Sequence, residues 1–320
     1  MSSKTEAVQF LKTHDSFLIL GHKEPDGDCV ASQITMASIV SGLGKKASLH
    51  SVGPFDRPEI EGFAEQFTGS IPSEKLSGAA VIIVDCSTPD RTGSLGSAVE
   101  GLPTLVIDHH SAGETFGTVR YVDDACPSTT FLVFSLFEEL KIPVDPGTAR
   151  LLLFGFCTDT GFFRHLGRGS PETFQTLSRI SACGTSPQEV YMMIYGRREL
   201  SGRKLLADLL LRVESYKEGR LLVSWQTTED RKRHGALQRG EDELYRLLQT
   251  VRGAVVIAFI KEEREGGYSV GLRSNSPVDV GKVAAGFGGG GHRQAAGFDI
   301  KGSLESVKDV VVKTVSSILG

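Results

Sequence analysis

The 320-residue sequence has no long hydrophobic run and no cysteine pair in the C-x-x-C spacing. Its longest apolar runs, Leu151–Cys157 and Val255–Ile260, are far shorter than the ~20 residues that a membrane-spanning helix needs. The five cysteines are odd in number, which argues against a disulfide framework and against a thiolate zinc site. The first twenty residues lack the pattern of a signal peptide. These absences favour a protein of the reducing cytoplasm without a membrane partner.

A strong excess of positive charge is also missing, because the formal net charge is −4. A protein that coats long duplex DNA would usually carry a much more basic face, so duplex nucleic acid is not expected as a partner. The charge is divided unevenly: residues 1–185 carry a net −8 and residues 186–320 a net +4. Either this is chance scatter, or an acidic half gathers cations and a basic half gathers anions. Composition alone leaves both explanations open.

The length is typical of about two domains, and the first half alternates short apolar segments with helical patterns. Strands are predicted at Ser16–Gly21, Ala47–Val52, Ala79–Asp85 and Thr104–Asp108, and helices at Gly27–Ser41, Ser128–Leu140, Thr148–Cys157 and Pro171–Cys183. Ser128 and Thr129 are expected to cap the helix that they open. This alternation predicts an α/β fold with a mainly parallel sheet flanked by helices.

Residues 186–216 are predicted to be a helical linker, formed by one long charged helix from Pro187 through Arg212. Residues 217–320 predict a smaller α/β domain. Its strands are expected at Arg220–Trp225, Ala254–Lys261 and Tyr268–Arg273, and its helices near Asp242–Thr250 and Leu304–Ile318. Two glycine clusters, at residues 266–267 and 286–291, punctuate this domain as loops.

Polar motifs follow three of the predicted strands. The first is HKEPDGD, which contains His22, Asp26 and Asp28; the second is Asp85; the third is DHH, Asp108–His110. A fourth motif, TDTG, contains Asp159 and follows a predicted helix. Each motif alone has an ordinary explanation as a turn, a cap or a packed histidine. Because ligands bind beyond the carboxyl ends of parallel strands, the motifs together predict one site on that rim.

Carboxylates mixed with imidazoles, without thiolates, suit Mn²⁺ or Mg²⁺ better than structural zinc. The four carboxylates of Asp26, Asp28, Asp85 and Asp159 sum to −4, which two divalent ions neutralise. Two such ions are suited to in-line attack of an activated water on phosphorus. The first half therefore indicates metal-assisted hydrolysis of a phosphoester.

The second half contains a glycine-rich segment, GLRSNSPVDVGKVAAGFGGGGHRQAAGF, at residues 271–298. Four consecutive glycines, Gly288–Gly291, let backbone N–H groups approach an anion closely. Arg273 and His292 offer charge to a phosphate or an edge to a base. The alternative is a flexible surface loop, which is the commonest fate of a glycine run.

These motifs, in this order, resemble those of the DHH phosphoesterases, and GFGGGGH at residues 286–292 resembles the glycine–histidine motif of their DHHA1 partner domain. The resemblance covers nearly the whole chain. Size and domain order are most similar to the stand-alone NrnA-type nanoRNases and pAp phosphatases. The resemblance implies a DHH catalytic domain at residues 1–185 and a DHHA1 substrate-binding domain at residues 217–320.

The resemblance also implies a role for each motif residue. Two Mn²⁺ ions are expected, with Mg²⁺ or Co²⁺ as alternatives, one held by His22, Asp26 and Asp85 and the other by Asp28, Asp85, His109 and Asp159. Asp85 would bridge the ions, His110 would contact the scissile phosphate, and Asp108 would orient a neighbouring imidazole. The substrate would be gripped from the second domain by Arg273, Gly289, Gly290, Gly291 and His292.

The leading hypothesis is a phosphoesterase that degrades very short single-stranded oligoribonucleotides to mononucleotides and also dephosphorylates pAp. One alternative is a phosphodiesterase of cyclic or linear dinucleotides such as c-di-AMP, pApA or pGpG. A manganese pyrophosphatase is disfavoured because pyrophosphate offers no base for the GGGGH segment to recognise. A non-catalytic nucleotide sensor, the alternative of another class, would be favoured by loss of a metal ligand, and none is lost. Substrate ranking, cleavage polarity, a homodimer and the roles of Arg164 and His165 stay open.

Overall fold

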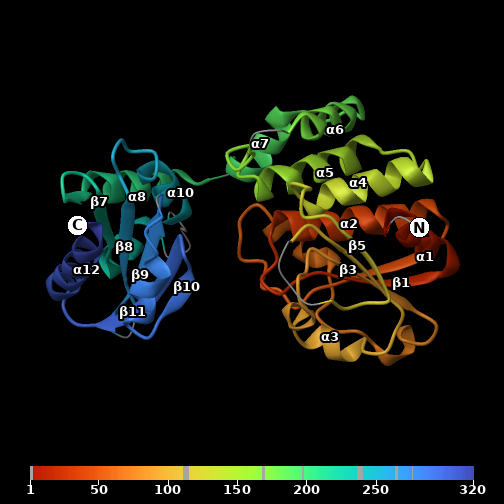
Figure 1. Cartoon of the computed structure of the whole chain (residues 1–320), viewed down its shortest axis with the longest axis horizontal. Helices are drawn as coiled ribbons and strands as arrows, with labels where there is room; N and C mark the ends of the chain where they lie inside the picture. Colours follow the sequence, from red (N-terminus) through yellow and green to blue (C-terminus); the bar gives the residue numbers. More distant parts are fainter. Residues whose placement is uncertain are drawn as a thin grey trace. The chain divides into compact units, whose positions relative to one another are not determined.

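The computed structural model describes residues 3–110, 115–167, 170–196, 198–235, 241–263, 266–275 and 277–320. The chain forms two compact units, Met1–Arg197 and Arg198–Gly320 (Figure 1). None of the helices in the described ranges is both long and apolar enough to cross a membrane.

The first unit contains a five-stranded sheet in the order β2-β1-β3-β4-β5. Its strands are β1 (Ser16–Leu20), β2 (Lys46–His50), β3 (Ala80–Val84), β4 (Thr104–Asp108) and β5 (Val119–Val122). Every neighbouring pair is parallel, so the carboxyl ends of all five strands lie at one edge. The predicted α/β class with a parallel sheet is confirmed, and β5 is a strand that the sequence reading did not identify.

Helices cover both faces of this sheet. The helices are α1 (Ser3–Thr13), α2 (Gly27–Gly42), α3 (Ser94–Ala98), α4 (Thr129–Leu140), α5 (Pro146–Asp159), α6 (Pro171–Ala182) and α7 (Pro187–Tyr195), with 3₁₀ turns at Glu61–Gln66, Ser73–Lys75 and Pro89–Thr92. The main core lies between one face and α1, α2 and α4, with α5 packed on α2 and α4, and it includes the buried rings of Phe137, Phe154 and Phe156 (Figure 1). A smaller cluster packs α3 on the other face through Leu95.

The N-terminus of α4 is capped differently from the prediction. Ser128 is the N-cap residue, but its side chain makes no capping hydrogen bond within the described residues. The Asp28 carboxylate instead accepts from the backbone N–H groups of Thr129 (2.7 Å) and Thr130 (3.1 Å). A buried carboxylate satisfies these otherwise unpaired amides and interacts favourably with the helix dipole. The predicted start of the helix is confirmed, because Ser128 is its N-cap residue, but the expectation that the Ser128 and Thr129 side chains supply the capping hydrogen bonds is wrong.

The long helix predicted from Pro187 through Arg212 is also wrong, because two helices occupy this segment: α7 and α8 (Leu200–Leu211). A capping box between Ser186 and Glu189 starts α7. The helix ends before Gly196, whose backbone is extended, in keeping with the low helix propensity of glycine. Helix α7 belongs to the first unit and α8 to the second.

The second unit contains a six-stranded mixed sheet in the order β10-β11-β9-β8-β7-β6. Its strands are β6 (Glu214–Tyr216), β7 (Leu221–Gln226), β8 (Val256–Glu262), β9 (Gly267–Ser274), β10 (Gly290–His292) and β11 (Ala295–Lys301). Only β7 and β8 pair in parallel among these described strands. The prediction of a loop at residues 286–291 is wrong for its last two residues. Gly290 and Gly291 belong to the edge strand β10 and pair with β11.

Two helical layers enclose the second core. Helices α11 (Val280–Ala285) and α12 (Leu304–Leu319) pack on one face, and α8 and α10 (Glu241–Leu248) on the other; α9 (Thr228–His234) packs beside α8. Helices α8 and α10 pack over β7 and β8. The same face of β9, β11 and β10 lines a cavity, described below.

Helix α5 allows a first test of the fold. Its N-cap, Asp145, accepts from the amides of Gly147 (2.8 Å) and Thr148 (3.1 Å) and from the Thr148 hydroxyl. These hydrogen bonds, that of the hydroxyl first, lower the pKa of the Asp145 carboxyl. We expect Asp145→Ala to lower the free energy of unfolding by about 1 kcal/mol near pH 7. A lowered pKa means that this stabilisation exists above the ordinary carboxyl pKa and is lost as pH falls through the folded-state value.

Urea titrations of wild type and Asp145→Ala at about pH 7 and about pH 2 measure this difference. Asp145→Asn, which keeps one acceptor oxygen, is the control. A difference that stays constant over this pH range would contradict the assignment of the cap to the ionised carboxylate.

Candidate metal centre

Three neighbouring strands deliver imidazoles and carboxylates to the carboxyl edge of the parallel sheet. His22 follows β1, Asp85 follows β3, and Asp108 is the last residue of β4, with His109 and His110 directly after it. Since β1, β3 and β4 are adjacent and parallel, these side chains meet although they are far apart in sequence.

Asp85 lies between two imidazoles. The Nε2 atom of His22 is 3.6 Å from Asp85 Oδ2, and the Nε2 atom of His109 is 3.6 Å from Asp85 Oδ1. Asp26 approaches His22 Nε2 at 3.9 Å, and Asp159 approaches His109 Nε2 at 3.3 Å. One carboxylate is therefore shared by two clusters of nitrogen and oxygen donors, each of which has the composition of a divalent-metal site.

The Asp85 backbone adopts an unusual conformation, with φ of 55°. Left-handed backbone at a residue other than glycine costs about 1–3 kcal/mol and persists only where the surroundings impose it. Here the Asp85 amide donates to the carbonyl of Ile107 (2.9 Å), and the Thr129 hydroxyl donates to Asp85 Oδ1 (3.0 Å). The fold thus holds this carboxylate in a strained position at the centre of the site.

Backbone carbonyls fix both imidazoles. His22 Nδ1 donates to the carbonyl of Lys23 (2.8 Å), and His109 Nδ1 donates to the carbonyl of Cys126 (3.2 Å). In these tautomers the Nε2 atoms carry a lone pair and face the carboxylates. The Nε2 of His109 is buried and has no hydrogen-bond partner among the described residues. A buried ring nitrogen without a partner, oriented through its other nitrogen, is typical of a metal ligand.

Asp28 completes the second cluster, since one of its oxygens lies within reach of both His109 and Asp159. It is fully buried, and Thr130 Oγ1 donates to it at 2.8 Å. A Cβ atom at Gly155 of α5 would lie 2.8 Å from Asp28 Oδ1 and 2.4 Å from a methyl carbon of Thr130. Glycine is therefore required at position 155 for Asp28 to occupy this place.

The carboxylates are electrostatically unbalanced without a cation. Burial raises the pKa of Asp28 well above its usual range, and the charges of Asp85 and Asp159 add to this effect. Burial and the charge of Asp85 raise the pKa of Asp159 to about 6, although His109 opposes the shift. A divalent cation between such groups removes the cost of holding their charges together. The donor set, the unpartnered His109 nitrogen and this imbalance all fit divalent cations.

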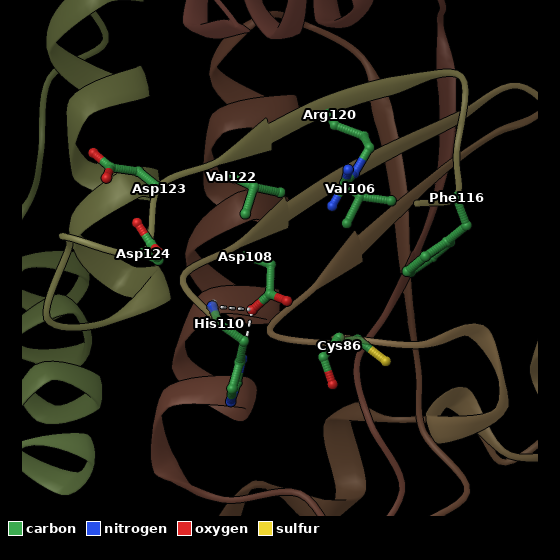
Figure 2. Close-up of a pocket in the computed structure, with 10 residues that line it drawn as sticks. Cys86, Val106, Asp108, His110, Phe116, Arg120, Val122, Asp123 and Asp124 are labelled. Atoms are coloured by element: carbon green, nitrogen blue, oxygen red, sulfur yellow. Dashed lines mark hydrogen bonds and ion pairs between the residues drawn. The ribbon is translucent and has the colours of Figure 1, made fainter. Parts of the chain in front are cut away.

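Asp108 supports His110 beside these clusters. Its Oδ1 atom accepts from His110 Nδ1 (2.7 Å) and from the backbone amides of His109 (2.8 Å) and His110 (3.3 Å). The hydrogen bond with Asp108 raises the pKa of His110. Figure 2 shows this pair at the rim of a pocket of about 230 Å³.

The same pocket contains an arginine that the sequence reading did not identify. Arg120 of β5 points into it next to Val106 (Figure 2), and its buried Nε has no acceptor within the described ranges. Thr129 and Thr130 were likewise missed as partners of the acidic residues. No local signal marks them, because Thr129 and Asp28 lie 101 positions apart in the sequence.

The residues predicted to grip the substrate lie in the second unit. Arg273, Ala295 and His292 pair across β9, β11 and β10, so their side chains share one face of the sheet. A cavity of about 630 Å³ on this face is lined by Arg273 and by Gly289, Gly290 and Gly291. His292 lies on the edge strand β10, at the end of the row formed by Arg273, Ala295 and His292, and is exposed.

The two units together define an α/β protein with a donor cluster for divalent cations in one unit and a glycine-lined cavity in the other. The family described as "DHH family, N-terminal domain" matches residues 16–156, and the "DHHA1 domain" matches residues 234–320. The bifunctional oligoribonuclease and PAP phosphatase NrnA of Thermus thermophilus is 31% identical over 302 residues, 93% of this chain and 88% of the relative. The chain belongs to the DHH family, which confirms the resemblance carried by its motifs.

Two further proteins are similar to this chain, one in structure and one in sequence. An exopolyphosphatase-related protein of Bacteroides fragilis has a solved structure with a TM-score of 0.84 at 19% identity, covering 98% of this chain and 96% of that chain. The manganese-dependent inorganic pyrophosphatase of Methanothrix thermoacetophila is 25% identical over 206 residues, 61% of this chain and 64% of the relative.

Competition between protons and metal follows from the raised pKa of Asp159. Because its carboxyl is protonated below about pH 6, we expect the affinity for Mn²⁺ to weaken as pH falls from about 7.5 to about 5. Isothermal titration with Mn²⁺ at both pH values measures this change. In Asp159→Asn the affinity should be lower at the higher pH and should vary less with pH; equal pH dependence in both proteins would contradict the assignment.

Proposed function

We propose that this protein is a metal-dependent phosphoesterase that hydrolyses very short oligoribonucleotides to mononucleotides and removes the 3′-phosphate of pAp. The observation that carries the proposal is the sharing of Asp85 between His22 and His109, at 3.6 Å from each. The identity to NrnA over 93% of this chain supports the substrate class. We assign catalysis to residues 1–185, a linker role to residues 186–216 and substrate binding to residues 217–320. We assign the activity to the cytoplasm.

We assign the two donor clusters to two Mn²⁺ ions, which Mg²⁺ or Co²⁺ can replace. His22, Asp26 and Asp85 would hold the first ion, and Asp28, Asp85, His109 and Asp159 would hold the second. When bound, such ions lower the pKa of water and stabilise negative charge on phosphate oxygens. The pyrophosphatase relative, which is named as manganese-dependent, supports the choice of Mn²⁺.

The remaining residues of the site orient groups around the phosphate. Asp108 accepts from Nδ1 of His110, which leaves Nε2 of His110 directed away from this bond and able to contact a phosphate oxygen. The raised pKa of His110 favours its protonated form, which donates to an anion. Thr129 keeps Asp85 in its strained position between the two clusters.

In the second unit, we assign binding of a phosphate or a base of the substrate to Arg273 and His292, which share one sheet face, and Gly289, Gly290 and Gly291 line the cavity beside Arg273. All six proposed ligand positions carry metal-binding residue types, which argues against a sensor without activity. Cyclic and linear dinucleotides would use the same residues, so the first experiment includes them.

The central experiment compares substrates of different length. We expect purified protein with Mn²⁺ to cleave labelled RNAs of two to five nucleotides faster than a 20-mer, and to dephosphorylate pAp. Excess EDTA should abolish turnover, and added Mn²⁺ should restore it. Full activity in EDTA would rule out the metal mechanism, and preference for cyclic di-AMP over diribonucleotides would favour the dinucleotide alternative.

Asp85→Ala should be the most damaging single substitution in the first unit, because its carboxylate serves both clusters. We expect kcat to fall by at least about a thousandfold. Asp15→Ala removes an exposed carboxylate after α1 and is the control for loss of charge. A folded Asp85→Ala protein with nearly wild-type kcat would show that Asp85 has a structural role only.

Arg273→Ala and His292→Ala should act on binding. Loss of a charge-assisted hydrogen bond costs about 1.5–3 kcal/mol, so KM for a dinucleotide should rise about ten- to a hundredfold while Mn²⁺ binding is kept. Arg293→Ala is the matched control, because this neighbouring guanidinium donates to the carbonyl of Pro277. If Arg273→Ala has no effect on any substrate, the binding assignment is wrong even with the metal site correct.

A further inference from the structure

A tyrosine stacks on the arginine to which we assign substrate binding. Tyr245 belongs to α10 and Arg273 to β9, and the guanidinium carbon of Arg273 lies 4.5 Å from the centre of the Tyr245 ring. This distance is within the range of a cation–π interaction. Tyr245 is buried, so its ring forms a fixed surface rather than a mobile one.

Two neighbours hold the Tyr245 ring in place. Phe259 of β8 packs edge-on against it, with ring centres 6.2 Å apart and planes at 82°. Gly271 makes room for its hydroxyl, because a Cβ atom there would lie 2.2 Å from Tyr245 Oη. Gly271 and Arg273 are two positions apart on one strand and therefore face the same side of the sheet. The missing side chain at position 271 lets the ring lie beside Arg273.

The stacking on Tyr245 fixes the orientation of the Arg273 guanidinium at the cavity. One of its five donors, on Nη1, is bonded to the carbonyl of Leu272 on its own strand (3.0 Å). The guanidinium lies over Tyr245 at the cavity that Gly271 and Gly297 also line. A guanidinium that stacks on an aromatic ring keeps its N–H groups in its own plane, where they can still bind a phosphate. Its long, flexible side chain loses little further freedom on binding when the ring already fixes it.

We propose that Tyr245, which lines the cavity beside Arg273, is a positioning residue: its ring holds the Arg273 guanidinium in the orientation that binds the substrate. This inference rests on the proposed binding role of Arg273. It predicts that the aromatic ring matters and the hydroxyl does not, and that the effect disappears once Arg273 is gone.

The test compares Tyr245→Leu, Tyr245→Phe and Leu248→Ala. Leu248 lies on the same helix in the same core cluster, so its truncation is a matched control for lost packing. KM and kcat are measured on 5′-phosphorylated diadenylate with Mn²⁺, and melting temperatures are recorded for each variant. We expect Tyr245→Leu to raise KM about five- to tenfold with kcat within about twofold of wild type. Tyr245→Phe should keep the wild-type KM, and Leu248→Ala should lower the melting temperature without changing KM.

A double-mutant cycle then isolates the coupling between the two side chains. In the Arg273→Ala background, Tyr245→Leu should change KM less than about 1.5-fold, because the stacked partner is already absent. A full-sized effect in that background, or an equal rise in KM for Leu248→Ala, would overturn the inference. If Tyr245→Leu does not fold, Tyr245→Met replaces it in the same cycle, with the same expectations.

The outcomes separate this inference from the proposed function. If Arg273→Ala raises KM and Tyr245→Leu does not, the inference fails while the binding role of Arg273 stands. If Arg273→Ala keeps the wild-type KM, the binding role fails and the inference fails with it. If Tyr245→Phe raises KM as much as Tyr245→Leu, the hydroxyl is the active group and positioning by the ring is wrong.

Discussion

The first unit depends on keeping buried carboxylates charged beside one another. Asp28 is fully buried, and it accepts hydrogen bonds from two backbone amides and one hydroxyl at the start of α4. These bonds tie the N-terminus of α2 to that of α4, while Gly155 lets α5 approach the same carboxylate. Three helices are thus positioned by one acidic group. The repulsion between Asp28, Asp85 and Asp159 is the remaining cost, and divalent cations at the sheet edge would relieve it.

The second unit solves a different problem, which is to present the Arg273 guanidinium at an open sheet face. Glycines at positions 271, 290 and 297 pair across β9, β11 and β10, so backbone rather than side chains forms that part of the cavity floor. Arg273 stands beside this floor against the ring of Tyr245. The acidic first half and the basic second half of the sequence accord with these two roles.

Local patterns predicted most of the framework. The apolar, β-branched run at Ala80–Val84 and the strand at Thr104–Asp108 are where hydrophobicity placed them, and the polar motifs after them lie at the shared edge. The predictions of secondary structure failed where a hydrogen-bonding partner distant in the sequence takes the place of a local one. The Asp28 carboxylate, rather than the Ser128 side chain, accepts from the first amides of α4, and β10 forms because β11 offers it hydrogen bonds across the sheet. Glycine has a low strand propensity, so the glycine run adopts a strand conformation because it pairs with β11.

The sequence by itself determined the fold class and the ordered motifs at one edge of the sheet, because strand periodicity and motif order are local properties, and the resemblance of those motifs to the DHH family implied the candidate metal ligands. Only the tertiary structure decided which oxygen of Asp85 faces which imidazole, that Thr129 and Thr130 hold the acidic residues, and that Tyr245 stacks on Arg273. These contacts join side chains that lie tens of positions apart. Their geometry is set by how helices and strands pack, which no short stretch of sequence encodes.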